Sequence, residues 1–172
     1  WGDASSGGAN SPADVTNATG VISIAATRTA FAVLKEDGSV SVWGNAANGG
    51  ANAPADVTIV TAGARVTSIA ATRGAFAALK ADGSVSAWGN AANGGTGAPL
   101  DVTTATAGAE VISVASTGYA FAALKADGSV SAWGNTLYGG SGVPASATSP
   151  ALGAEVVSIA STEYAFGVLH AN

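Results

Sequence analysis

Hydrophobic and polar residues alternate along three short segments near the start of the chain. Residues 21–27 read VISIAAT, residues 30–35 read AFAVLK and residues 39–43 read SVSVW. Alternation at every second residue is typical of β-strands, and these segments are rich in β-branched, aromatic and small residues. No segment of the chain shows the helical period of about 3.6 residues. The pattern therefore predicts an all-β protein of short strands, without helices.

Turn-forming residues separate these segments. Asp37-Gly38 stands between the second and third segments, and an Asp-Gly pair is typical of a tight hairpin because glycine tolerates positive φ. The second and third strands are therefore expected to be antiparallel. A loop rich in Asn, Gly and Pro follows the third segment and leads to a short ADVT segment at residues 55–58. This segment is our candidate for a fourth strand at the sheet edge.

The same segments recur along the chain with a period of 45 residues. Trp43, Trp88 and Trp133 follow this spacing, and the first unit is three residues shorter in a loop. The period also holds for Phe31, Phe76, Phe121 and Phe166, and for Leu34, Leu79, Leu124 and Leu169. We therefore predict one repeat domain, residues 1–172, with units of about 1–38, 39–83, 84–128 and 129–172.

Neither face of the third strand carries a charge. Val40 and Val42 point to one side, and Ser39, Ser41 and Trp43 point to the other. Such a strand fits a sheet covered on both faces by neighbouring sheets. Complete burial of one large apolar side chain stabilises by about 1.5–3 kcal/mol, and a single unit cannot achieve this burial alone. We therefore expect a β-propeller-like array of about four blades, with a β-solenoid as the alternative.

The chain begins inside the repeated phrase. Trp1 stands where Trp133 stands in the third unit, and Asn172 stands where Asp127 does, so the equivalent of five residues is missing between the two ends. We therefore expect one blade to be incomplete at the chain ends. The chain is then either a homo-oligomer or a fragment of a longer array. The absence of Met likewise indicates a processed product or a fragment.

Composition excludes several classes of protein. The chain has 172 residues, of which 48% are hydrophobic and 10% are charged, with a net charge of −5. This composition excludes a disordered chain. No apolar run approaches the roughly 18–20 residues of a membrane helix, so we expect no membrane insertion. The dispersed, acidic charge favours no nucleic-acid partner. The absence of Cys excludes disulfides and thiolate chemistry.

A full unit resembles the repeat of the regulator of chromosome condensation family. The likeness covers essentially the whole chain and is carried by Trp-Gly-Asn at 43–45, Gly-Gly at 49–50, Pro54, and the Ala-x-Leu-x-x-Asp-Gly that closes each unit. It implies a β-propeller, commonly of seven blades, closed by strands from both chain ends. The family's Gly-Gly-x-His turn is replaced here by Thr-Arg-Thr-Ala at 27–30. The units are also shorter, so the chain resembles a divergent, bacterial-type branch.

The sequence offers no catalytic or cofactor-binding pattern. His170 is the only histidine and takes the position held by lysine in the other units. We interpret it as a solvated repeat position, which leaves no Ser–His–Asp arrangement. No metal-ligand cluster, nucleotide-binding glycine motif or cofactor motif occurs. Residues 17–19, Asn-Ala-Thr, match an N-glycosylation acceptor, which has meaning only in a eukaryotic secretory setting. We predict that the protein is not an enzyme.

The aspartates recur at two positions of the unit. Those that precede glycine are expected to form turns rather than bind metal; they are Asp37, Asp82 and Asp127. Those in the short ADVT or LDVT segments are expected to accept hydrogen bonds from local backbone N–H groups; they are Asp14, Asp56 and Asp101.

The repeats differ most in the turn between the first and second strands. The turn carries Arg28 in the first unit, Arg73 in the second, Tyr119 in the third, and Glu163 and Tyr164 in the fourth. The loop after the Trp strand varies too, with Tyr138 where other units have Asn. Tyr and Arg are frequent interface anchors when they cluster. These six residues are our candidate binding site, and drift in exposed loops is the alternative.

Three functions fit these observations. The first is a non-catalytic binding or scaffolding module, bacterial and extracellular or at the cell surface, that recognises a protein or glycan through the variable loops. The second is a structural protein that self-assembles into a ring or filament through the incomplete blade. The third is guanine-nucleotide exchange on a small GTPase, which the family resemblance implies. The loss of the family's turn motif makes the third the least favoured.

Overall fold

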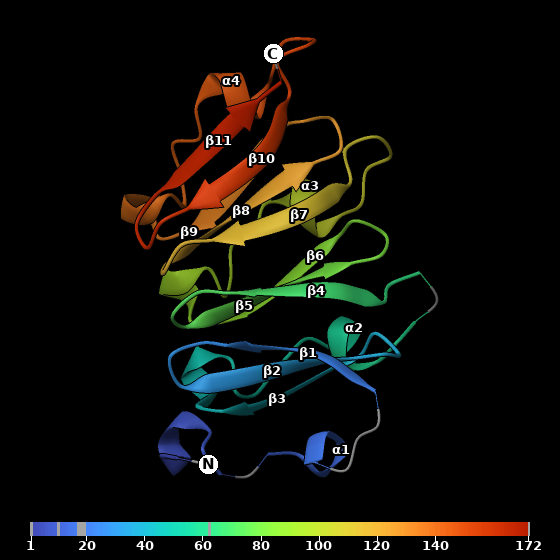
Figure 1. Ribbon diagram of the computed structural model, residues 1–172, viewed down its shortest axis with the longest axis vertical. Helices are drawn as coiled ribbons and strands as arrows, with labels where there is room; N and C mark the ends of the chain where they lie inside the picture. Colours follow the sequence, from blue (N-terminus) through green and yellow to red (C-terminus); the bar gives the residue numbers. More distant parts are fainter. Residues whose placement is uncertain (1, 10, 17–19, 62, 172) are drawn as a thin grey trace.

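The protein forms four small antiparallel sheets that follow one another along its length (Figure 1). The computed structural model describes residues 2–9, 11–16, 20–61 and 63–171. Three sheets have three strands each, in the order of the sequence, and the fourth has two. The strands are β1 (Val21–Ala26), β2 (Ala30–Lys35), β3 (Val40–Gly44), β4 (Val66–Ala71), β5 (Ala75–Lys80), β6 (Val85–Gly89), β7 (Val111–Ser116), β8 (Ala120–Lys125), β9 (Val130–Gly134), β10 (Val156–Ser161) and β11 (Phe166–His170).

Short helical turns connect the sheets, so the expectation of a chain without helices is wrong. Each sheet is preceded by a 3-10 turn and then by a single turn of α-helix, and the first such pair lies before the first sheet. The 3-10 turns are η1 (Ala4–Ser6), η2 (Ala46–Asn48), η3 (Ala91–Asn93) and η4 (Thr136–Tyr138). The α-helical turns are α1 (Ala13–Thr16), α2 (Ala55–Thr58), α3 (Leu100–Thr103) and α4 (Ala145–Thr148).

The candidate fourth strand is therefore a helix instead, and the preceding proline explains why. Pro54 has φ −56° and lies at the N-cap of α2, a geometry that suits the start of a helix. Its carbonyl accepts hydrogen bonds from the backbone N–H groups of Val57 and Thr58. The helical turn buries Val57 against the neighbouring sheets. The segment thus satisfies its own backbone and contributes one core residue, so it has no need of a strand partner.

The Asp-Gly hairpins form as predicted, and they fix the strand register. Gly38, between β2 and β3, has φ +85°, and the Asp37 carboxylate accepts hydrogen bonds from the Ser39 backbone and hydroxyl at 2.8 and 2.7 Å. The resulting register places Phe31 opposite Trp43, and their rings stack with centroids 5.1 Å apart. The same pairing recurs in the second and third sheets at 5.3 Å.

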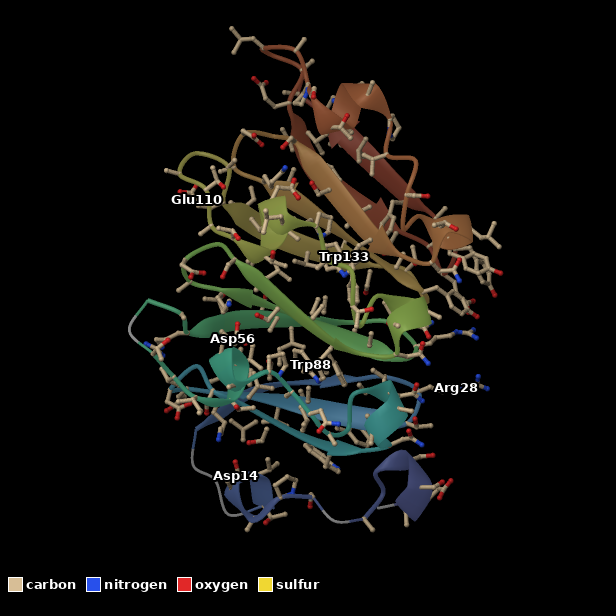
Figure 2. The ribbon with its side chains drawn as sticks, turned by 180° about the vertical axis from the view of Figure 1, so that it is seen from behind. Asp14, Arg28, Asp56, Trp88, Glu110 and Trp133 are labelled. Atoms are coloured by element: carbon tan, nitrogen blue, oxygen red, sulfur yellow. The ribbon has the colours of Figure 1, made fainter. Side chains whose placement is uncertain are left out.

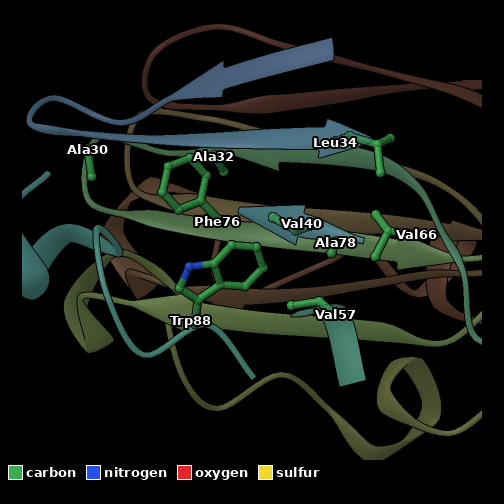
Figure 3. Packing of buried hydrophobic residues seen from close by; sticks show 9 residues of the cluster. All are labelled: Ala30, Ala32, Leu34, Val40, Val57, Val66, Phe76, Ala78 and Trp88. Carbon is green, nitrogen blue, oxygen red and sulfur yellow. The ribbon is translucent and has the colours of Figure 1, made fainter. Parts of the chain in front are cut away.

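The core lies between consecutive sheets (Figure 3). One face of the first sheet contributes Ala32, Leu34 and Val40, and these pack against Phe76 and Trp88 of the second sheet. Equivalent clusters join the second sheet to the third and the third to the fourth. Each sheet is thus stabilised mainly by its neighbours, as the two uncharged faces of the third strand indicate.

The four sheets form an open array in the described part of the chain. The first and last sheets lie at opposite ends of the long axis, and the strand direction turns gradually between them (Figure 1). The described residues of the four sheets therefore do not close into a ring. Within the described residues the fourth sheet has two strands, whereas each of its three counterparts has three. The prediction of propeller-like blades with one incomplete blade is confirmed.

Candidate functional site

The turns between the first and second strands of the four sheets lie in one continuous row. The backbone N–H of Arg28 donates to the Arg73 carbonyl at 2.9 Å, that of Arg73 to the Gly118 carbonyl at 2.9 Å, and that of Gly118 to the Glu163 carbonyl at 2.8 Å. We call these turns, residues 27–29, 72–74, 117–119 and 162–164, the turn row. It runs across all four sheets and is held by backbone bonds that do not depend on the side chain at each position.

A threonine at the start of each turn fixes its shape. The Thr72 hydroxyl accepts a hydrogen bond from the Ala75 backbone at 3.0 Å and donates to the Asn93 carbonyl at 3.0 Å. Thr117 repeats both contacts, with Ala120 and Tyr138. The turn of one sheet is thereby tied to the 3-10 turn that precedes the next sheet. The residue at the end of that 3-10 turn consequently lies beside the turn row.

Side chains from the ends of the 3-10 turns lie between the turns of the row. In the part of the row formed by the first two sheets, these side chains are polar. The Asn48 side chain donates to the Thr29 hydroxyl at 2.7 Å. A Cβ built on Gly74 would lie 2.9 Å from Oδ1 of Asn48 and 3.0 Å from Oδ1 of Asn93, so Gly74 lies between the two amides. Sequence reasoning missed Asn48 and Asn93. Their signal is that Thr or Gly in the turn accompanies Asn, whereas Tyr119 accompanies Tyr138.

The second half of the row is aromatic. Tyr119 and Tyr138 have ring centroids 4.6 Å apart, Tyr138 and Tyr164 are 5.4 Å apart, and Tyr119 and Tyr164 are 6.1 Å apart. The three tyrosines come from separate turns up to 45 residues apart in sequence. Tyr164 is exposed and the other two are half-buried. Such a cluster offers large, rigid rings with polar tips, which suits recognition at a surface.

Charged side chains cross the row beside these rings. The Arg73 guanidinium forms an ion pair with the Glu163 carboxylate and lies 5.2 Å from the centroid of the Tyr119 ring. Gly118 lies next to this ion pair: a Cβ built on it would be 3.5 Å from Nε of Arg73 and 3.3 Å from Cγ of Glu163. The absence of a side chain at this turn leaves room for an arginine of the second sheet to reach the fourth.

An open groove of about 500 Å³ follows the turn row and is lined by residues of all four turns. The structure places all six sequence-predicted residues along the row. It brings Arg73, Tyr119, Tyr138, Glu163 and Tyr164 together at one end. Arg28 is joined to them through the backbone row, and its exposed side chain projects away from the sheets (Figure 2).

A repeated ion pair lies at the ends of the strands that are opposite the turn row. Asp56 accepts hydrogen bonds from the Lys80 ammonium at 2.7 Å and from the Ser86 hydroxyl, and Asp101 repeats these contacts with Lys125 and Ser131. Asp14 does the same in the first unit. The local backbone N–H groups expected from the sequence make only the weakest contact of these aspartates, and the main partners are lysine and serine side chains. Each one lies on a helical turn directed at the next sheet, so it reaches side chains there.

These contacts shift the acidity of the carboxyl groups. Burial disfavours the charged form of Asp56 and Asp101, but the hydrogen bonds from lysine and serine outweigh it and hold the pKa of both below the usual value. The pKa of Asp14 is also lowered, first by the Ser41 hydroxyl and then by Lys35. These groups therefore join helical turns to sheets and are ionised at neutral pH.

The fourth unit replaces both members of this ion pair. Ser146 stands in the place of the aspartate, and His170 stands in the place of the lysine. Nδ1 of His170 lies 2.7 Å from the Ala154 carbonyl, and the ring is half-buried rather than fully solvated. Among the described residues, no group of three or more His, Cys, Asp or Glu side chains could hold a metal ion. No helix in the described ranges is long and apolar enough to cross a membrane. The predicted glycosylation acceptor at 17–19 lies outside the described residues, as do Trp1 and Asn172.

The fold is an array of β-propeller blades, and the turn row is a surface whose residues vary from blade to blade. No family model matches the sequence, and no curated protein matches it. Solved structures that are similar in fold include the following three. Prp20p of Saccharomyces cerevisiae has a TM-score of 0.52 and 23% identity, over 69% of this chain and 33% of its own. Human WBSCR16 has a TM-score of 0.56 and 18% identity, over 88% and 45%.

The third is yeast RCC1 (Prp20) in its complex with Kap60, with a TM-score of 0.52 and 19% identity over 74% of this chain and 35% of its own. These proteins are RCC1-like β-propellers, so the comparison supports the propeller fold. At 18–23% sequence identity it supports nothing beyond the fold. The present chain spans between one third and one half of their length.

Proposed function

We propose that the chain is a non-catalytic binding module that recognises a protein partner through the turn row. The observation that carries the proposal is the convergence of Arg73, Tyr119, Tyr138 and Tyr164 from three sheets onto one surface. Residues of these two types dominate the binding energy of many interfaces. The backbone bonds between turns hold this surface rigid, which lowers the entropy lost on binding.

Two features of the row favour a peptide-like partner that carries an acidic group and an apolar group. The Arg28 end offers an exposed cation, and the aromatic end offers two half-buried rings and one exposed ring beside the Arg73–Glu163 pair. Structures of similar fold belong to proteins that bind proteins: Prp20p binds Gsp1p and histones, and yeast RCC1 binds Kap60. A partner with an acidic group and a nearby apolar group would match Arg28 at one end of the turn row and the tyrosines at the other.

The test uses a random peptide library displayed on phage and selected against the intact chain. Peptides recovered in this way should lose affinity by about tenfold or more for a Tyr119→Ser, Tyr164→Ser double variant, because each truncated anchor removes about 1 kcal/mol or more. The matched control is Leu100→Ser, which changes an exposed apolar residue on α3, at the opposite edge from the turns. Peptides that bind the double variant unchanged and lose affinity for Leu100→Ser would contradict the proposal. A glycan array tested with the same variants separates the glycan alternative.

Self-association is a second candidate function, favoured by the outer face of the fourth sheet. Leu169 is 62% exposed there, whereas Leu34, at the equivalent position of the first sheet, is 1% exposed because the second sheet covers it. A concentration series in analytical ultracentrifugation tests this candidate, since a monomer at every concentration would remove it. Nucleotide exchange on a small GTPase and a bacterial cell-surface location stay predictions, and a nucleotide-release assay tests the former.

A further inference from the structure

Arg28 and Arg73 stand at the same position of two neighbouring turns, but only Arg73 has a carboxylate partner. The Arg73 guanidinium forms an ion pair with Glu163, which belongs to the turn two sheets further along the row. Two sheets beyond Arg28 the equivalent residue is Gly118, which has no side chain. Within the described residues Arg28 forms no ion pair. The turn row therefore contains one arginine that holds a carboxylate and one that is open.

The Arg73 guanidinium is held in place without the help of Glu163. The Arg73 backbone is fixed on both sides, because its N–H donates to the Gly118 carbonyl and its carbonyl accepts from the Arg28 N–H, each at 2.9 Å. The guanidinium lies 5.2 Å from the centroid of the Tyr119 ring, a distance at which a cation is attracted to the ring face. Its planar fork of N–H donors matches the geometry of a carboxylate. A binding site for a carboxylate is thus formed in advance.

The Glu163 carboxylate can leave this site at little cost. In the described part of the chain, Arg73 is the only residue to which this carboxylate is hydrogen-bonded. Both side chains are 43% exposed, and an ion pair at such a surface contributes little to stability. The turn does not depend on the pair, because the Glu163 backbone carbonyl accepts the hydrogen bond from the Gly118 N–H. The Glu163 side chain can therefore turn into water while the turn row keeps its shape.

We propose that Arg73, on the Tyr119 ring, is a binding site for an acidic side chain of the protein partner, and that Glu163 occupies this site in the unbound chain. The internal ion pair itself shows which chemical group the site accepts. Arg73 and Glu163 both line the groove of about 500 Å³ along the turn row, so a partner segment in the groove reaches them. The inference rests on the proposed function of the row and adds a second acidic group to the partner, beside the one that pairs with Arg28.

Glu163 is then a competitor of the partner. An acidic side chain that binds Arg73 must displace Glu163, and the cost of breaking the internal pair lowers the affinity of the partner. A neutral amide side chain cannot replace the carboxylate, because hydrogen bonds to a charged acceptor are roughly twice as strong. Removal of the Glu163 charge should therefore strengthen the binding of acidic ligands and leave neutral ligands unaffected.

The experiment titrates the intact, isotope-labelled chain with two synthetic peptides that are capped at both ends. The acidic peptide is Gly-Glu-Tyr-Glu-Gly, and the neutral peptide has glutamine in place of both glutamates. The caps leave the side chains as the only carboxylates, and the tyrosine matches the aromatic end of the row. The NMR signal of the Arg73 Nε–H group reports contact with the guanidinium. We expect the acidic peptide to shift this signal saturably and the neutral peptide to leave it in place.

Two matched glutamate variants test the competition. Glu163→Gln removes the internal carboxylate and should strengthen the acidic peptide by about two- to fivefold. Glu110→Gln makes the same change in net charge just before β7, at the opposite ends of the strands from Arg28 (Figure 2), and should leave the affinity unchanged. Arg73→Gln removes the guanidinium and should lower the affinity of the acidic peptide to that of the neutral one. Circular dichroism verifies that the variants remain folded.

Two results would overturn the proposal. The first is an Arg73 signal that the acidic peptide does not shift, or that both peptides shift equally. The second is an affinity for the acidic peptide that is the same in Glu163→Gln and Glu110→Gln. Both results leave the proposed function intact, since that function fails only when the peptides selected from the library bind independently of Tyr119 and Tyr164. An Arg73 signal that responds to the acidic peptide in such a case would keep the carboxylate site and remove the aromatic one.

Discussion

The stacking faces of the sheets repeat almost unchanged from unit to unit, whereas the turn row differs at every step. Phe76 and Phe121 occupy equivalent positions on β5 and β8, and both are fully buried between sheets. Arg73 and Gly118 occupy equivalent positions in the turns, and they differ in charge and in size. Both regions are built on the same strands. Packing between sheets therefore constrains which residues can occupy the stacking faces. The hydrogen bonds between the turns involve backbone atoms only, so they can form whichever side chain stands at each position.

The largest effect should follow from a change to a stacking face. Phe121→Ala is expected to destabilise the protein by about 3–5 kcal/mol, because the ring is buried at 0% exposure between two sheets and stacks on Trp133. Phe31→Ala is the matched control. It removes the same side chain at the half-buried end of the array and should be less destabilising. Urea denaturation measures both, and equal losses would show that stacking between sheets is not the source of stability.

A glycine beneath that ring should have the next largest effect. Gly94 has φ +90°, and a Cβ there would lie 2.7 Å from the Phe121 ring. Gly94→Ala should therefore cost about 2–3 kcal/mol, from backbone strain and from displacement of the ring. Gly97→Ala has similar strain at φ +76° but open space around it, and should cost only about 1 kcal/mol. The difference between their unfolding free energies isolates the steric contact.

The ion pairs at the helical edge should give a smaller effect that depends on pH. The Lys125 ammonium and the Asp101 carboxylate are 2.6 Å apart, with side-chain exposures of 10% and 47%. Asp101→Asn should cost about 1 kcal/mol at neutral pH, because the aspartate is partly solvated. The pKa of Asp101 is lower in the folded state than its usual value of 3.8. Its stabilisation is therefore complete above about pH 4 and is lost as the pH falls through the folded pKa.

The measurement compares urea midpoints of the native chain and of Asp101→Asn over this range of pH. The gap between the two curves should close as the carboxyl group becomes protonated. The matched control is Asp14→Asn, in which the lysine partner is more exposed, at 23%. Its gap should be smaller at every pH. If the difference in urea midpoint between the native chain and Asp101→Asn did not change with pH, the ionisation of Asp101 would contribute nothing to stability.

The sequence predicted the repeated part of the molecule better than the variable part. The strands, the Asp37-Gly38 hairpin and the stacking of sheets follow from alternation and period, because each unit faces the same packing problem. The short helices could not be predicted from the sequence pattern, because four residues are too few to show a helical period. Pro54 was the available signal. The six binding candidates were found as positions that differ, but sequence alone could not place Asn48 and Asn93 among them. Their contacts join a turn to the 3-10 turn of the next unit.

The smallest effect on stability should come from the turn row itself. Arg73→Ala removes an ion pair with Glu163 and a contact with the Tyr119 ring, yet both charged side chains are 43% exposed, so the loss should stay below about 1 kcal/mol. Glu163→Ala should be similar, and the double variant should show a coupling energy of a few tenths of a kcal/mol. The backbone bonds of Arg73 and Gly118 remain in each variant, so the turns should keep their positions. If Arg73→Ala instead destabilised the chain as much as Asp101→Asn, the pair would hold the sheets together, and the row would not be free to vary for recognition.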